Sequence, residues 1–266
     1  MIKINKDLSD IPNSLKSKEI QDKRNELISK GEYTKSKDKK ERTKFDRFYK
    51  TEDIKEKLEK IYNRKCAYCE RDVEDTEYHI EHYRPKSIYY WLSYSYDNLL
   101  LSCARCNKNK GDKFEVEYSQ VKFDCNDLEN IHNLTEKYNE IEKPKIVNPD
   151  LEDVEDKLIF DVNTGSIDSD DPRCKHTIEL CKLSRKEASN RRKKIWNDFI
   201  EKYNVYKLKL SMGDKSSIIS LRDKINEFIK DSKDITKEYL AFRRYIVRNE
   251  EIIKNYNKQK EKQWKQ

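Results

Sequence analysis

The C-terminal part of the chain repeats apolar and polar residues with the period of an α-helix. Ser184 and Glu187 fit a capping box at a helix start, and Gly213 interrupts the pattern. Between them, one apolar stripe runs through Ala188, Ile195, Phe199, Tyr203, Tyr206 and Leu210. Two further stripes follow, one through Ile218, Leu221, Ile225 and Phe228, the other through Ile235, Tyr239, Phe242 and Ile246. The pattern therefore predicts three helices, then a frayed helix or tail over residues 252–266.

The N-terminal part is polar and rich in lysine. It includes the charged stretch KSKDKKERTK at residues 35–44, and it predicts an extended arm, one charged helix at about 17–30 and a linker. Thr51 is a candidate N-cap, because acidic residues follow it in the first turn. Apolar residues then recur at helical spacing, at Ile54, Leu58 and Ile61.

Residues 64–114 have a different pattern. Short strand-like runs such as Glu77–His82 replace the long helical stripes, and aromatic residues cluster between residues 83 and 96. The chain as a whole is therefore expected to be α+β and mainly helical. We divide it into an N-terminal arm with helices (1–60), a compact central unit (61–125), and a connection with C-terminal helices (126–266).

Composition and charge narrow the class of protein. Charged residues make up 41% of the chain and hydrophobic residues 35%, which predicts a modest core. The formal net charge of +7 suits a nucleic-acid partner, but it equally suits a heavily solvated surface. The chain contains no run of ~18 apolar residues, so the sequence predicts no membrane-spanning helix. The first ten residues lack the apolar stretch of a secretory signal, so we expect a cytoplasmic protein.

The cysteines form the first chemical pattern. Seven are present, and in a cytoplasmic protein they do not predict a disulfide framework. Four of them fall in two C-x-x-C pairs, Cys66–Cys69 and Cys103–Cys106, which match tetrahedral ligation of a structural zinc ion. A folded unit must lie in the gap of residues 70–102 to bring the pairs together. The other three, Cys125, Cys174 and Cys181, are expected to be buried reduced thiols.

Residues in and after this gap resemble the motif of HNH endonucleases, which have a ββα-metal fold. The motif begins with an acid–His–x–x–Pro segment, Glu81-His82-Tyr83-Arg84-Pro85. It continues with Asn98 before the second cysteine pair and ends with Asn107 directly after its last cysteine. Each piece is weak alone, but in this order they are specific.

The resemblance implies a role for each motif residue. His82 is the general base, since a neutral imidazole can take a proton from water near pH 7. The Glu81 carboxylate and the Asn107 side-chain carbonyl are the ligands of a catalytic Mg²⁺, or of Mn²⁺ in its place. Asn98 holds the loop through backbone hydrogen bonds and so aims His82.

Two positions depart from the common motif. Most members of the group have Asp before the catalytic histidine, where this chain has Glu81. Many have His at the last position, where this chain has Asn107. Both changes keep an oxygen or nitrogen ligand, so they alter metal preference more than the class of reaction.

Residues around the motif have two interpretations. His79 shares a strand face with Glu81 and is a third ligand or a partner of the carboxylate, or else a packed strand residue, which the pattern favours. Arg84, Lys108 and Lys110 are candidate phosphate contacts or solvated charges. The aromatic residues Tyr89–Tyr96 can stack on bases, but packing of the core by Trp91 and its neighbours is favoured. The basic run Arg191–Lys194 is a nucleic-acid contact or, preferably, a solvated helix face.

Longer strings narrow the resemblance to the nuclease subunits of Septu-type anti-phage defence systems, which also occur in some retron operons. The strings are MIKINK, CAYCE, HIEHYRPK, NLLLSCARCNKNKGDKF, VNPDLEDVEDKLIFDVNTG and TIELCKLSR. They cover about residues 1–195. The resemblance implies a bacterial defence effector that acts with a PtuA-like ATPase of the ABC/SMC class.

Two other functions stay open. One is a zinc-knuckle scaffold that binds nucleic acid without cutting it, although scaffolding alone has no need of the Glu81–His82 pair. The other is a ribonuclease that cuts host tRNA, with DNA favoured over RNA as the substrate. In a complex with the ATPase, the docking surface is expected on the flanks, residues 1–60 and 126–266.

Overall fold

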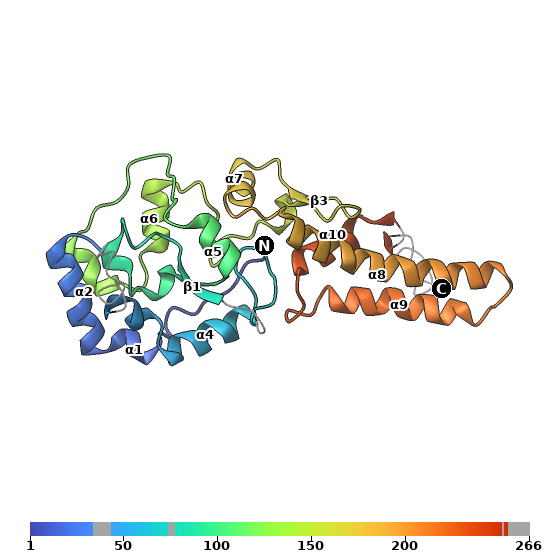
Figure 1. The fold of residues 1–266 in the computed structure, drawn as a ribbon, viewed down its shortest axis with the longest axis horizontal. Coiled ribbons are helices and arrows are strands. Elements are labelled where there is room, and N and C mark those ends of the chain that lie inside the picture. The colour runs from blue at the N-terminus through green and yellow to red at the C-terminus, as the bar shows by residue number, and fades with distance from the viewer. Residues whose placement is uncertain (34–43, 74–77, 252, 255–266) are drawn as a thin grey trace, which may run out of the picture.

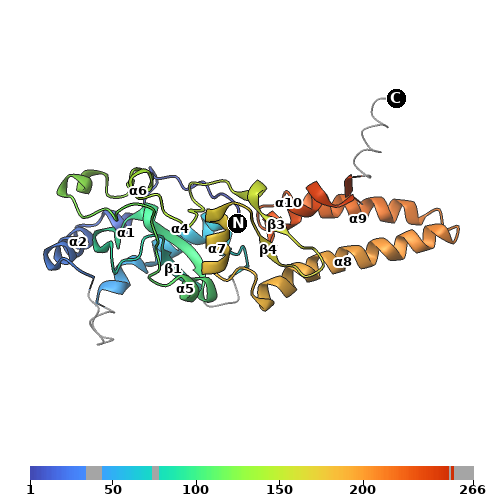
Figure 2. The ribbon, with the colours of Figure 1, turned by 90° about the horizontal axis from the view of Figure 1, so that it is seen from above.

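The computed structural model of the chain is elongated, with a broad body at one end and a two-helix hairpin that projects from it (Figure 1 and Figure 2). The structure describes residues 1–33, 44–73, 78–251 and 253–254. The predicted charged stretch at 35–44 and the predicted tail at 252–266 lie almost wholly outside these residues. No helix in the described part of the chain is long and apolar enough to cross a membrane.

The N-terminal segment packs onto the body. Residues 1–12 form no helix or strand, yet Met1, Ile2 and Ile4 are buried. They lead into α1 (Asn13–Lys16), α2 (Lys18–Lys30), the 3-10 turn η1 (Arg47–Tyr49) and α4 (Glu52–Tyr62). Thr51 holds the N-cap position of α4 as predicted. Its hydroxyl, however, donates to Asp53 Oδ1 at 2.7 Å and accepts no hydrogen bond from a helix N–H group.

A two-stranded antiparallel sheet and one short helix form the centre of the body. β1 (Tyr78–His82) pairs with β2 (Leu99–Cys103), and the register places His82 opposite Leu99. α5 (Ala104–Lys110) follows β2 directly. Every residue of β2 is buried, which explains its nearly continuous apolar run. The predicted fold class, mainly helical around a small ββα unit, is confirmed.

The connection between the strands and the segment after the sheet complete the body. The strands are joined through the 3-10 turns η2 (Tyr90–Leu92) and η3 (Tyr96–Asn98). After α5 come η4 (Cys125–Asn130), α6 (Thr135–Glu142), η5 (Glu155–Lys157), β3 (Ile159–Phe160), β4 (Ile167–Asp168) and α7 (Pro172–Leu180).

Buried contacts cross the boundaries drawn at residues 60 and 125. Lys6 Nζ donates to the Leu99 carbonyl at 2.5 Å, and Arg84 pairs with Glu142 at 2.8 Å. The flanking segments therefore share one core with the ββα unit.

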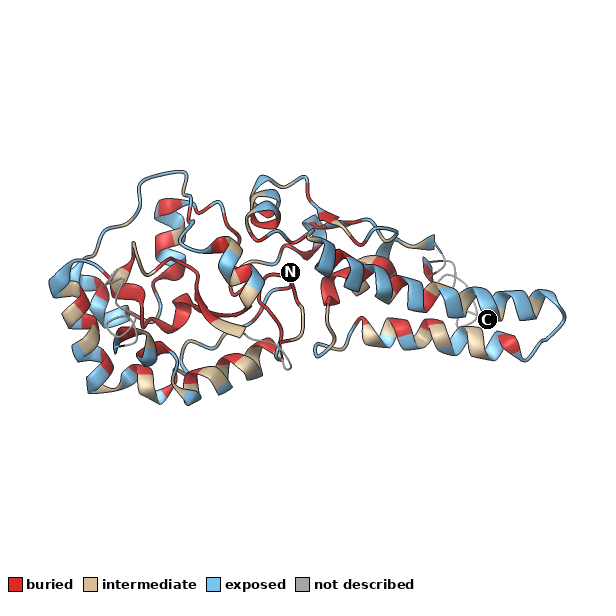
Figure 3. Cartoon of the chain, viewed as in Figure 1, coloured by how far each residue is buried: buried red, intermediate tan, exposed pale blue. Residues whose placement is uncertain are grey.

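The C-terminal helices differ in detail from the predicted pattern. α8 (Lys186–Ser211) and α9 (Ser217–Asp231) form the hairpin and contact through Phe199 and Phe228, whose ring centroids are 4.7 Å apart. α10 (Leu240–Asn249) is shorter than predicted, because Ile235 lies before it and is 54% exposed. Figure 3 shows that buried residues concentrate in the body, whereas the outer half of the hairpin is mostly exposed.

The predicted capping box of Ser184 and Glu187 at the start of α8 is wrong. The Ser184 hydroxyl donates to the Ile167 carbonyl at 2.6 Å and accepts from the Ile167 N–H group at 3.0 Å. Arg185 stands at the N-cap position instead. The serine is therefore used to join β4 to the start of the helix rather than to cap it.

Candidate active site and metal centre

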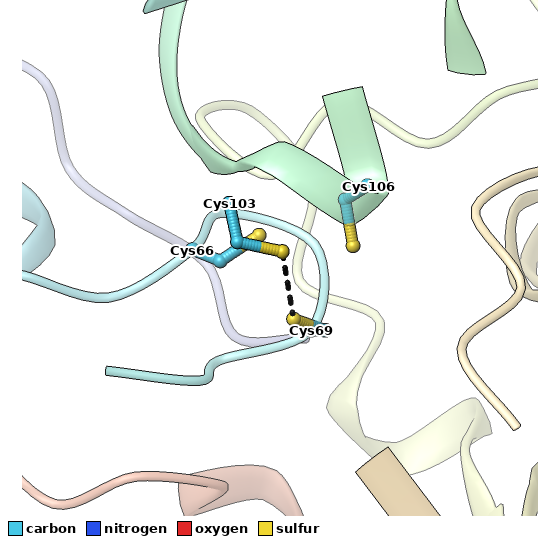
Figure 4. A group of neighbouring side chains, drawn as sticks. All are labelled: Cys66, Cys69, Cys103 and Cys106. Carbon is cyan, nitrogen blue, oxygen red and sulfur yellow. Dashed lines mark hydrogen bonds between the residues drawn. The ribbon is translucent and has the colours of Figure 1, made fainter. Parts of the chain in front are cut away.

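The two cysteine pairs meet in one buried cluster. Cys66 and Cys69 lie in the turn after α4, Cys103 ends β2, and Cys106 lies in α5. Their four sulfur atoms all lie within 4.8 Å of one another, and Cys69 and Cys103 are 3.8 Å apart (Figure 4). Sulfur ligands at about 2.3 Å from a central Zn²⁺ would stand about 3.8 Å apart in a tetrahedron. The four thiols therefore fit a tetrahedral metal ion of this kind.

Arg185 covers this cluster and was not singled out in the sequence. Its guanidinium donates to Cys69 Sγ at 3.4 Å, to Cys106 Sγ at 3.7 Å and to Cys103 Sγ at 3.8 Å. Four thiolates around a divalent ion leave a net negative charge, which a neighbouring guanidinium offsets. Nothing local in the sequence marks this role, since Arg185 is 79 residues from the nearest of these cysteines.

His82 lies at the end of β1 and is only 6% exposed. Its Nε2 atom is 3.0 Å from the Ser93 carbonyl oxygen. Because a carbonyl only accepts hydrogen bonds, this contact assigns the proton to Nε2 and leaves the lone pair on Nδ1. Burial lowers the pKa of His82 to about 3, and the positive charge of Lys86 acts in the same direction. The imidazole is therefore neutral at pH 7.

A small polar cluster lies beside His82. Lys86 Nζ donates to Tyr49 Oη at 2.7 Å and to Tyr33 Oη at 3.3 Å, and it pairs with Asp46. The side chain of Lys86 is 23% exposed, so it remains reachable from solvent. None of these residues is a position of the motif, although Lys86 ends the HIEHYRPK string that contains its first segment.

Asn98 makes the backbone hydrogen bonds expected of a residue that holds a loop. Its side-chain oxygen accepts from the Arg84 N–H group at 2.7 Å. Its amide nitrogen donates to the Arg84 carbonyl at 3.0 Å and to the Leu92 carbonyl at 3.3 Å. The residue is fully buried and ties the chain after His82 to the η2 turn.

Glu81 is buried and both of its carboxylate oxygens are engaged. Lys110 Nζ donates to Oε1 at 2.7 Å, and the Asn107 amide donates to Oε2. Burial raises the pKa of Glu81, while the charge of Lys110 opposes this shift. The two expected ligands, Glu81 and Asn107, are therefore adjacent. A Mg²⁺ ion does not fit the site in this arrangement, because the ammonium group of Lys110 already donates a hydrogen bond to the carboxylate of Glu81.

Two of the three expected phosphate contacts are wrong. Arg84 is fully buried, and its guanidinium bonds to Glu142 Oε2 at 2.8 Å and to Asn139 Oδ1 at 2.7 Å. Lys110 is also fully buried, against Glu81. Both cations form ion pairs inside the fold and do not face solvent. Lys108 is exposed on α5, and its phosphate contact stays a prediction.

The aromatic residues of the interstrand segment pack inside the body, as favoured. Trp91 is buried and its Nε1 donates to Tyr138 Oη at 3.2 Å, while Tyr89, Tyr94 and Tyr96 are fully buried. The interpretation that these four rings stack on bases is therefore wrong. His79 is half-buried, and its role as a partner of the carboxylate stays a prediction.

Two other expectations need correction. Cys174 and Cys181 are buried as predicted, but Cys125 is exposed. In the basic run of α8, Arg192 is buried and donates to the Gly165 carbonyl at 2.6 Å, so it is not part of a solvated face. Its neighbours Lys193 and Lys194 are exposed.

The ββα unit, with its cysteine cluster and its Glu–His pair, defines a nuclease of the HNH class. Residues 66–113 match the family model described as HNH endonuclease, so this part of the chain is an HNH endonuclease domain, which makes the protein a phosphodiester hydrolase.

Similarity to proteins of known name shows which HNH nucleases the chain resembles. The chain is 28% identical over 242 residues to the Septu protein PtuB of Bacillus mycoides (strain KBAB4), a match that covers 75% of this chain and 78% of that protein. It is 47% identical over 60 residues to the Septu protein PtuB of Bacillus thuringiensis, which covers 22% of this chain and 23% of that protein. The chain is thus similar to the Septu PtuB proteins over a stretch that includes its HNH domain.

Proposed function

We propose that this chain is the nuclease effector of a Septu-type anti-phage defence system, and that it hydrolyses phosphodiester bonds of nucleic acid, DNA in preference to RNA, in the cytoplasm. The observation that carries the proposal is the setting of His82. It lies on β1 of a matched HNH domain, with Nε2 held by the Ser93 carbonyl and with a neutral ring.

His82 is proposed as the general base. With the proton on Nε2, Nδ1 accepts a proton from the attacking water, and the Ser93 carbonyl then stabilises the imidazolium that forms. Asn98 is a positioning residue, since it holds the backbone that follows His82. Lys86, which is partly exposed, and Lys108, which is exposed, are proposed to contact the substrate phosphates.

Zn²⁺ is proposed as the ion of the cysteine cluster, where it would be held by Cys66, Cys69, Cys103 and Cys106. It would fasten the turn after α4 to the junction of β2 and α5, and so stabilise the fold without taking part in the reaction. The Mg²⁺ or Mn²⁺ ion expected at Glu81 and Asn107 is supported by the use of metal ions in HNH nucleases. The contacts of Lys110 stand against it as the site is arranged.

A cleavage assay with the zinc-loaded chain tests this function. Supercoiled plasmid, linear duplex DNA and tRNA are offered as separate substrates, and His82→Ala is compared with the unchanged chain. The variant should lose about 10²–10⁴-fold in rate while its zinc content and melting temperature stay the same. Full activity of His82→Ala would refute the mechanism. Binding of DNA without any cleavage would favour the scaffold alternative, and cleavage of tRNA alone would favour the ribonuclease.

We further propose that a PtuA-like ATPase of the ABC/SMC class is the partner. The names of the relatives support a Septu system. The hairpin supplies a surface, because half of the large exposed apolar side chains among the described residues gather near its tip, at Val205, Leu208, Met212, Ile218 and Ile219. The docking surface was expected on the flanks, residues 1–60 and 126–266, and within them we propose α8 and α9.

Co-expression with the ATPase and size-exclusion chromatography test the partner. The complex should form with the unchanged chain and be weakened by Leu208→Glu together with Met212→Glu. The control is Tyr118→Glu, which alters an exposed apolar residue of the body at 66% exposure. A chain that stays monomeric beside the ATPase, and that cuts phage nucleic acid unaided, would refute this proposal.

A further inference from the structure

Lys110 is the last residue of α5, the helix that also carries Asn107. Its side chain is fully buried, and Nζ donates to Glu81 Oε1 at 2.7 Å and to the His82 carbonyl at 2.7 Å. A third, longer contact of 3.5 Å reaches the Gly111 carbonyl. All three hydrogens of the ammonium group therefore have oxygen partners inside the nuclease centre.

The ammonium occupies the position that a metal ion would need. A divalent cation binds carboxylate oxygens at about 2.1 Å and would have to approach the same lone pairs of Glu81. Asn107 already donates to the other carboxylate oxygen. Two cations on one buried carboxylate would repel each other strongly, because the surroundings hold little water to screen them. Glu81 therefore accommodates either the ammonium or a divalent ion.

We propose that Lys110 is the resident cation of Glu81, and that a divalent metal ion enters the nuclease centre only by displacing the ammonium group. Lys110 is then a positioning residue that holds the carboxylate in place in the metal-free protein, and it sets the metal affinity of the nuclease. The inference rests on the proposed nuclease function of this site, and it explains why the two expected ligands meet in an arrangement that excludes the ion.

The first test measures Mn²⁺ binding to the zinc-loaded full chain by electron paramagnetic resonance of the free ion. Lys110→Met removes the competing charge and should bind Mn²⁺ at least about tenfold more tightly than the unchanged chain. The titration is run at pH 8, because a buried Glu81 without its lysine takes up a proton more readily. Adding Glu81→Gln to Lys110→Met should abolish the gain. Lys108→Met, an exposed lysine on the same helix, is the matched control and should change the affinity little.

The second test uses the unchanged chain, so it does not depend on the folding of a variant. Lysine side chains are labelled by reductive methylation, with and without Mn²⁺, and the sites are read by mass spectrometry. Lys110 should be protected without Mn²⁺ and become labelled as Mn²⁺ binds, whereas Lys108 should be labelled in both conditions.

Two outcomes would overturn the inference. One is a folded Lys110→Met chain that binds Mn²⁺ no more tightly than the unchanged chain. The other is a Lys110 that stays protected at Mn²⁺ concentrations that saturate the site. Neither measurement depends on cleavage, so a chain that exchanges Lys110 for Mn²⁺ but cuts nothing would refute the proposed nuclease function alone.

Discussion

The ring of Tyr49 stands edge-on to the imidazole of His82, with centroids 4.6 Å apart and ring planes at 83°. Tyr49 belongs to η1, far from the motif in sequence, and is itself buried. Its hydroxyl accepts from Lys86, which fixes the ring against the histidine. The residue that we propose as the base is therefore shielded by a side chain that the motif does not include.

Removing this shield should change the acid–base behaviour of His82. Burial is the main cause that lowers its pKa to about 3. Tyr49→Ala admits water and should raise the pKa toward the ordinary value of about 6.5. Titration of the His82 ring by NMR measures this directly. Tyr49→Phe keeps the ring and loses only the hydroxyl, so it should leave the pKa low.

The same change predicts a difference in the pH dependence of cleavage. With a pKa near 3, the unchanged His82 stays neutral across pH 5–8, so its protonation should not slow the reaction in that range. In Tyr49→Ala the rate should fall as the pH drops through the raised pKa. An NMR titration that finds His82 near its ordinary pKa in the unchanged chain would contradict the shielding.

The buried ion pair between Arg84 and Glu142 predicts a loss of stability. Both side chains are 0% exposed, and Glu142 also accepts from Tyr89 Oη at 2.6 Å. Arg84→Met leaves a buried carboxylate without its cation and should lower the free energy of unfolding by about 3–5 kcal/mol. Urea unfolding measures it.

The exposed pair of Lys145 with Glu115 is the control for this measurement. Lys145→Met should cost less than about 1 kcal/mol, as exposed ion pairs do. If Arg84 served the substrate rather than the fold, Arg84→Met would instead keep its stability and lose affinity for nucleic acid.

The cysteine cluster predicts that the fold depends on its metal ion. Cys103→Ser removes one of four ligands and should lower both the zinc content and the melting temperature, because metal binding and folding are coupled in such units. Elemental analysis and thermal unfolding follow the two quantities. Cys125→Ser changes an exposed thiol outside the cluster and should affect neither. One zinc ion per chain with full stability in Cys103→Ser would contradict the assignment.

Local patterns predicted the parts of this fold that depend on neighbours in sequence. The helical periodicity after Thr51 and around Phe199 matches α4 and α8. The spacing of the cysteine pairs predicted that a folded unit in the gap of residues 70–102 would bring the four sulfur atoms together. These features follow from short-range geometry, and a single sequence contains that information.

Whether an individual charged side chain is buried in an ion pair or exposed to solvent could not be predicted in this way. Arg84 and Lys110 are both cations beside the motif, and either of them could have faced a phosphate. Each instead has a partner that is distant in sequence. Glu142 is 58 residues from Arg84, and Glu81 is 29 residues from Lys110. Whether a charge is solvated or paired depends on tertiary contacts that residue spacing does not show.

Arg185 provides the last prediction, on the metal cluster. Its guanidinium donates to three of the four cysteine sulfurs, so it offsets the negative charge that four thiolates place around a divalent ion. Removal of such outer partners typically weakens metal binding by about 10–100-fold. Arg185→Met should therefore lose zinc faster to a coloured chelator and bind it at least about tenfold more weakly. Lys186→Met removes an exposed charge from the next position of α8 and should leave zinc affinity unchanged. Equal zinc affinity in both variants would show that Arg185 only attaches α8 to the body, and that the thiolates hold the ion without its help.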